Sequence, residues 1–228
     1  MKKLITLISL ISLLFIAAIA SEGDVGRIFT QDELGKNFAK TTLKMGYDYD
    51  GEVVATVVRR LPTLDSRRAV LYIHGFSDYF YQTEQAEKFH DMGYNFYALD
   101  LRKYGRSILP HQVPFTVRNL NEYFPEIDSA LNIIRKDGNN KIIIVAHSMG
   151  GLVASLYTNE RKSVPGLQGI ILNSPFLDFK QNKFSKKVVV PALSFIGSFL
   201  RNIRIPNGKR SVNCESIHIA LRGEWNFD

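Results

Sequence analysis

Cysteine is nearly absent from this sequence, because Cys214 is the only one among 228 residues. An intrachain disulfide is therefore excluded, and the core must hold the fold without covalent cross-links. We interpret Cys214 as a small buried or half-buried residue rather than a catalytic thiol, since no Cys/His pattern surrounds it. Internal repeats and low-complexity stretches are also missing. The chain therefore has the length and composition of one globular domain.

The sequence also lacks an apolar run long enough to span a membrane. The uncharged segment from Leu4 to Ile16 is shorter than the roughly 20 residues that a spanning helix needs. Lys2 and Lys3 precede it and Ala18-Ile19-Ala20 follows it, which is the pattern of a cleaved secretory signal. We therefore expect residues 1–20 to be a signal peptide, cleaved after Ala20, and the protein to be exported, either periplasmic or secreted. An uncleaved anchor is the alternative.

Acidic residues are outnumbered by basic ones. The formal net charge is +7, of which Lys2 and Lys3 contribute two, leaving +5 beyond the signal. No RNP, zinc-finger or helix-turn-helix pattern accompanies this charge, so we expect no nucleic-acid partner. A solvated surface is the plain interpretation, and attraction to anionic lipid headgroups, with peripheral membrane contact, is the alternative.

Short apolar runs alternate with amphipathic segments along most of the chain. Asp50-Gly51 separates two alternating segments, 43–49 and 52–60, and predicts a β-hairpin with a tight turn. Buried strands are predicted at 69–73, 94–99, 141–146 and 168–173, and helices at 83–92, 117–136 and 150–161. This order predicts an α/β fold with a mostly parallel sheet and helices on both of its faces.

The strongest motif is Ala146-His147-Ser148-Met149-Gly150-Gly151, which lies between a predicted strand and a predicted helix. Small residues two positions to either side of the serine are the pattern of a nucleophile elbow, although Ala146 stands where Gly is usual. Such a turn presents the Ser148 hydroxyl outside the sheet, and larger flanking side chains would collide. We therefore predict that Ser148 is a nucleophile and that the N–H of Met149 is one oxyanion donor.

His74-Gly75-Phe76 directly follows the predicted strand at 69–73. A loop at this place donates the second N–H of the oxyanion hole, and we assign this donor to Phe76. We interpret His74 as a residue that braces the loop through hydrogen bonds rather than as a catalytic base. In the next polar loop, we expect Asp100 and Arg102 to form a stabilising ion pair.

These segments together resemble the monoglyceride lipase and lysophospholipase branch of the α/β-hydrolases, a group also described as serine aminopeptidase S33-like. The matching residues are 72–76, 100–107, 146–151 and 173–178, within a region that covers roughly residues 40–180. The resemblance implies the α/β-hydrolase fold with a helical cap, which would begin with the amphipathic segment at 188–203. It also implies hydrolysis of ester bonds in lipids such as monoacylglycerols or lysophospholipids. We expect no cofactor and no metal.

The expected organisation is a signal peptide at 1–20, a hydrolase core at 21–180 and a cap region at 181–228. A hydrolase of this kind takes its acid and its histidine from loops that follow the serine in the chain. No apolar run after Asn173 predicts the strands that carry those loops, so we expect the last strands to be missing and the chain to be part of a longer hydrolase.

Asp178 and His218 have the right order to form a substitute triad with Ser148. Three other histidines are interpreted as packing or surface residues: His90, His111 and His147. The sequence thus predicts an exported serine esterase acting through an acyl-enzyme. Two alternatives stay open, an inactive remnant that binds a lipid or a partner, and an aminopeptidase, because the same elbow serves amides and esters.

Overall fold

The computed structural model describes residues 28–61, 66–178 and 187. The chain divides into two units, Met1–Asp178 and Phe179–Asp228, and every element below belongs to the first. The predicted signal peptide, the predicted cap helix at 188–203, Cys214 and His218 lie outside the described residues. No helix in the described part of the chain is long and apolar enough to cross a membrane.

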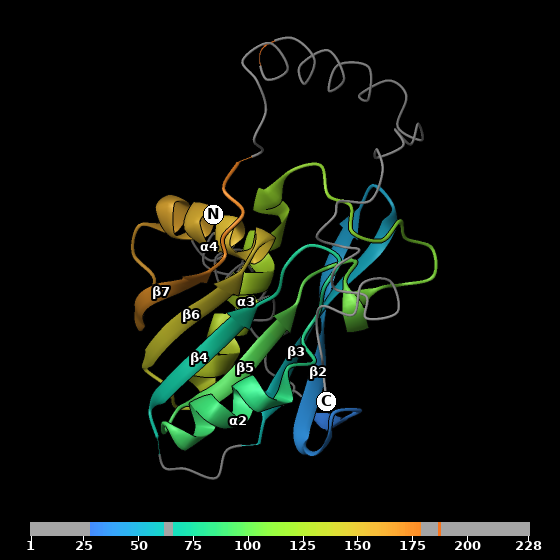
Figure 1. Ribbon diagram of the computed structural model, residues 1–228. Helices are drawn as coiled ribbons and strands as arrows, with labels where there is room; N and C mark the ends of the chain where they lie inside the picture. Colours follow the sequence, from blue (N-terminus) through green and yellow to red (C-terminus); the bar gives the residue numbers. More distant parts are fainter. Residues whose placement is uncertain (1–27, 62–65, 179–186, 188–228) are drawn as a thin grey trace, which may run out of the picture. The chain divides into compact units, whose positions relative to one another are not determined.

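A seven-stranded sheet forms the centre of the first unit, in the order β1-β2-β3-β5-β4-β6-β7 (Figure 1). The strands are β1 Thr30–Asp32, β2 Gly35–Asp48, β3 Gly51–Arg60, β4 Arg68–Ile73, β5 Asn95–Asp100, β6 Lys141–His147 and β7 Leu167–Asn173. The four strands from β5 to β7 in this order run parallel, and β1, β2 and β3 pair antiparallel with their neighbours. The predicted mostly parallel sheet is confirmed.

Helices cover both faces of this sheet, as the sequence predicts. The helices are α2 Thr83–Asp91, α3 Phe124–Lys136 and α4 Met149–Arg161, with short 3-10 helices η1 Gly105–Ser107 and η2 Leu120–Tyr123. In β4, Leu71 and Ile73 join the core that contains α3 and α4, whereas Val70 and Tyr72 join the core that contains α2. Because successive residues of a strand point to opposite faces, burial on both faces requires the continuous apolar run seen in the sequence.

The structure differs from the predictions at two places in this part of the fold. Asp48 pairs with Gly51, so the hairpin turn is centred on Tyr49 and Asp50 rather than on Asp50 and Gly51. The Asp48 carboxylate accepts the N–H of Asp50 at 2.8 Å, which fixes this turn, and Gly51 supplies the positive φ of 116° directly after it. The strand β1 is not predicted by the sequence patterns at all.

The predicted helix at 117–136 begins later and in a tighter form. Asn119 caps η2, accepting the N–H of Asn121 at 2.9 Å, while Glu122 accepts the N–H of Asn119 at 3.0 Å. The α-helical part begins at Phe124, where Pro125 fits the first turn because its missing N–H is not needed there. This capped start lies beside the edge of the sheet where the parallel strands end.

Candidate active site

Ser148 occupies a sharp turn between β6 and α4. Its backbone has φ 50° and ψ −117°, which is strained for a residue other than glycine. Hydrogen bonds hold this conformation, because Ser148 N–H donates to the carbonyl of Asn173 at 3.0 Å and its carbonyl accepts from Phe176 at 2.9 Å and from Gly151 at 3.0 Å. The residue is half-buried rather than enclosed in the core. The turn has the geometry of the predicted elbow, while the chemistry of Ser148 stays a prediction.

Two glycines allow this turn to lie close to the loop between β4 and α2, residues 74–82, here called the β4–α2 loop. A Cβ on Gly150 would lie 2.4 Å from the carbonyl oxygen of His74 and 2.7 Å from that of Ile73. A Cβ on Gly75 would lie 3.1 Å from the Cβ of Ser148. The elbow and the loop are therefore in direct contact, and at Gly150 a side chain does not fit without a shift of the backbone.

The two predicted oxyanion donors lie on these two segments. Phe76 belongs to the β4–α2 loop, and Met149 is the first residue of α4, where a backbone N–H has no acceptor inside the helix. Among the described residues, neither amide N–H has a hydrogen-bond acceptor. Two unengaged N–H groups thus belong to segments that meet at Ser148, as an oxyanion hole requires.

His74 braces the β4–α2 loop, as predicted. The side chain is fully buried, and its Nε2 accepts the N–H of Leu101 at 3.1 Å. Its Nδ1 lies 2.7 Å from the carbonyl oxygen of Gly75 and therefore carries the proton. Burial lowers the pKa of His74 and keeps the ring neutral. Both nitrogens are engaged, so the ring has no free position for proton transfer.

The predicted ion pair between Asp100 and Arg102 is wrong. Arg102 turns toward α3, where its guanidinium contacts the fully buried carboxylate of Glu126 and lies 3.7 Å from Glu122. Asp100 instead pairs with Arg106 at 2.8 Å. Nearness in the sequence does not predict the partner of Arg102, because long arginine side chains reach carboxylates on other elements. Burial raises the pKa of Glu126 to about 7, against the lowering effect of Arg102.

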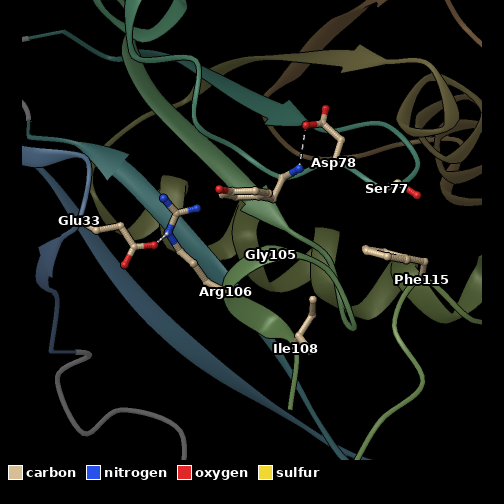
Figure 2. A pocket seen from close by; sticks show the side chains of 8 residues that line it. Glu33, Ser77, Asp78, Gly105, Arg106, Ile108 and Phe115 are labelled. Atoms are coloured by element: carbon tan, nitrogen blue, oxygen red, sulfur yellow. Dashed lines mark hydrogen bonds and ion pairs between the residues drawn. The ribbon is translucent and has the colours of Figure 1, made fainter. Parts of the chain in front are cut away.

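Arg106 ties the sheet to the β4–α2 loop. Its guanidinium binds Asp32 of β1 through two hydrogen bonds of 2.7 and 2.8 Å, and it donates to Asp100 at 2.8 Å and to the carbonyl of Phe80 at 2.9 Å. Arg106 lines a groove of about 390 Å³. Figure 2 shows Arg106 in the wall of this groove, with Phe115 at one end and Glu33 at the other. These contacts of Arg106 with Asp32, Asp100 and Phe80 are here called the Arg106 clasp. They fix the end of the β4–α2 loop that is next to α2, and the same loop carries Phe76.

We expect acid to weaken this clasp through Asp32. Burial raises the pKa of Asp32, but hydrogen bonds from Arg106 and Leu34 and the charge of Arg106 outweigh it, so the pKa lies below its usual value. Such a group stabilises the fold above its unfolded pKa, near 3.8, and the stabilisation is lost as the pH falls through the folded value.

The wild type should therefore exceed Asp32→Asn in free energy of unfolding at about pH 6, and this difference in free energy should shrink toward about pH 3. Urea unfolding at a series of pH values measures this, and a gap that does not vary with pH would contradict it.

The substitute triad of Ser148, Asp178 and His218 stays a prediction. Asp178 is exposed after β7, and His218 lies outside the described residues. His147 is a surface residue, as predicted, with a side chain 39% exposed and Nδ1 3.8 Å from a carboxylate oxygen of Asp78. Sequence reasoning missed Asp78, whose carboxylate also accepts the N–H of Gly75 at 3.4 Å. Its position two residues after Phe76 was the available signal.

His90 and His111 lie away from the elbow. His90 is on α2, and the Nε2 of His111 lies 3.1 Å from the carbonyl oxygen of Glu52 beside the β2–β3 turn. Both placements fit the predicted packing or surface roles. Among the described histidines, none forms a hydrogen bond with the Ser148 hydroxyl.

Comparison with solved structures identifies the fold. A highly thermostable carboxyl esterase from Bacillus coagulans, solved with glycerol, is 17% identical, with 79% of this chain and 62% of that chain covered and a TM-score of 0.57. The α/β hydrolase GrgF from Penicillium sp. sh18 is 17% identical, with coverage of 72% and 56% and a TM-score of 0.49. The chain thus spans about three fifths of the length of these structures. No curated protein matches it.

A family model describes the same region. The model of the family described as serine aminopeptidase, S33, matches residues 65–218, which is more than half of the chain. The matched region contains the β4–α2 loop, Arg106 and the elbow at Ser148. The chain therefore belongs to the serine aminopeptidase S33 family of α/β hydrolases.

Proposed function

We propose that this hydrolase cleaves carboxylic esters of lipids, of the monoacylglycerol or lysophospholipid type, through an acyl-enzyme on Ser148. One observation carries the proposal: the amides of Phe76 and Met149, unengaged among the described residues, belong to the two segments that meet at the strained elbow of Ser148. Donors fixed before the substrate arrives stabilise the negative charge that develops on an attacked carbonyl oxygen.

In this mechanism the Ser148 oxygen bonds to the acyl carbon, and the carbonyl oxygen becomes an oxyanion held by the two amides. Collapse of this intermediate breaks the ester bond, and the alcohol leaves with the proton taken from Ser148. Water then attacks the acyl carbon, releases the carboxylic acid and restores the hydroxyl. A histidine base would carry this proton; His218, with Asp178 as its acid, is the substitute within this sequence, and a histidine and an acid from later strands are the alternative.

Apolar side chains near the site support a lipid rather than a peptide substrate. Phe76, Ile108 and Phe115 are 61%, 39% and 36% exposed, and the rings of Phe76 and Phe115 meet edge to face with centroids 6.1 Å apart. Exposed apolar side chains on the loop that carries a proposed oxyanion donor, and in the groove that this loop lines, suit an acyl chain or the surface of a lipid aggregate. Peripheral membrane contact, and export directed by residues 1–20, belong to the same proposal.

The second candidate is amide cleavage, which the family description as serine aminopeptidase favours. Initial rates of the protein expressed from its complete reading frame distinguish ester cleavage from amide cleavage. We expect kcat/KM for a medium-chain monoacylglycerol to exceed that for aminoacyl 4-nitroanilides by at least about 100-fold, because the exposed side chains of Phe76, Ile108 and Phe115 bind the acyl chain. Faster cleavage of the anilides would overturn the lipid proposal, and binding of the lipid without turnover would identify an inactive binding module.

A further inference from the structure

Tyr104 lies between the two segments that carry the proposed oxyanion donors. Its side chain is buried, with 1% exposed, on the loop that follows β5. The hydroxyl donates to the Sδ of Met149 at 3.5 Å, and the ring meets the ring of Phe76 edge to face with centroids 6.4 Å apart. One side chain therefore touches both residues whose amides would bind the oxyanion.

A second contact joins Tyr104 to the same loop through His74. The two rings pack with centroids 4.8 Å apart. The His74 ring is itself hydrogen-bonded to the carbonyl of Gly75 and to the N–H of Leu101, so it cannot move without moving the loop. A shift of the Tyr104 ring would therefore reach the amide of Phe76 along two paths, by direct packing and through His74.

The backbone around Tyr104 holds this side chain inward. Tyr104 is extended, with φ −127° and ψ 147°, but its neighbours Lys103 and Gly105 have φ of 64° and 45°. A left-handed lysine is strained, and the strain is compensated by a buried ion pair between Lys103 and Asp48 at 2.9 Å. The carbonyl of Tyr104 also accepts the N–H of Ser107 at 2.8 Å.

We propose that Tyr104 is a positioning residue that sets the separation between the amide N–H groups of Phe76 and Met149. This inference rests on the proposed function, because it assigns Tyr104 to the same oxyanion hole. Tyr104 does not touch the reacting atoms. It acts by keeping the first turn of α4 and the β4–α2 loop at the spacing that an oxyanion needs, where small displacements cost much of the rate.

The test compares three variants of the protein expressed from its complete reading frame. Tyr104→Leu removes the ring, Tyr104→Phe keeps the ring and removes the hydroxyl, and Tyr97→Leu is the matched control. Tyr97 is equally buried, but it lies in the middle of β5 and bonds through its hydroxyl to Asp137 at the end of α3. Both leucine variants should lower the thermal midpoint, because both empty a packed core position.

The kinetics of monoacylglycerol hydrolysis then distinguish a positioning role of Tyr104 from a contribution to stability alone. We expect Tyr104→Leu to lower kcat by about 10- to 100-fold with KM nearly unchanged, since the ground state makes little use of the oxyanion donors. Tyr104→Phe should stay within about threefold of the wild type, because the thioether contact is weak. Tyr97→Leu should keep wild-type kcat per folded molecule.

Two results would overturn the inference without touching the proposed function. One is an active wild type with an equal loss of kcat in the Tyr104→Leu and Tyr97→Leu variants. The other is a change confined to KM. A wild type that hydrolyses no ester would instead remove the proposed function, and the inference with it.

Discussion

Replacing Ser148 with alanine is expected to lower kcat for ester hydrolysis by about 10⁴- to 10⁶-fold, the range seen when a member of the catalytic triad of a serine hydrolase is removed. The acyl-enzyme cannot form without the hydroxyl. The amides of Phe76 and Met149 would remain, so KM should change little and a small residual rate over water should persist. Initial rates on a monoacylglycerol, measured with the protein expressed from its complete reading frame, give this number.

Ser155→Ala is the matched control for this change. Ser155 lies on the same helix α4, and its hydroxyl donates to the carbonyl of Gly151 at 2.8 Å, so its loss perturbs the helix without removing a hydrogen bond of Ser148. We expect near wild-type kcat for this variant and an unchanged thermal midpoint for Ser148→Ala. A Ser148→Ala protein that kept a tenth or more of the wild-type rate would require another nucleophile.

Gly150→Ala is expected to abolish measurable hydrolysis and to lower the thermal midpoint strongly. The added Cβ would lie 2.4 Å from the carbonyl oxygen of His74 and 2.7 Å from that of Ile73, both backbone atoms that cannot rotate away. Either β4 or the elbow must move, which separates Ser148 from the β4–α2 loop. Overpacking of this kind costs about 1–3 kcal/mol or more, and the misplaced donors cost rate in addition.

Gly169→Ala makes the same chemical change at a site with room for it. Gly169 lies on β7, where an added Cβ meets no atom within 4 Å. This variant should retain the activity and thermal midpoint of the wild type, since β-strand backbone accepts alanine. Differential scanning fluorimetry and initial rates read out both variants. Full activity in Gly150→Ala would show that the elbow and the loop are not packed as described.

The core of the fold could be predicted because its signals are local. A run such as 141–146, with three isoleucines and a valine in succession, is apolar on both faces and fits only a strand covered on both sides. The elbow is equally local, because a strained turn between strand and helix needs small residues two positions from Ser148. Most strand and helix bounds accordingly differ by a few residues from the predictions, but β2 begins at Gly35 rather than at 43, and α3 begins at Phe124 rather than at 117.

The parts that sequence reasoning missed depend on partners distant in the chain. Asp32 and Arg106 are 74 residues apart, and nothing in either segment marks the other as its partner. The three-residue strand β1 is too short to show a pattern, and it holds its place through this pair. Likewise, the sequence shows Tyr104 only as one aromatic residue in a polar loop. Its contacts with Met149 and Phe76 are visible only in the folded structure.

The proposed acyl-enzyme mechanism depends most directly on which atom carries the acyl group. The decisive measurement is mass spectrometry of the protein expressed from its complete reading frame, acid-quenched during hydrolysis of a monoacylglycerol and then digested. We predict that the mass of one fatty acid, less water, is added to the peptide that contains Ser148. An acyl group bound to any other residue, or turnover without an acylated peptide even at substrate saturation and millisecond quenching, would contradict the account.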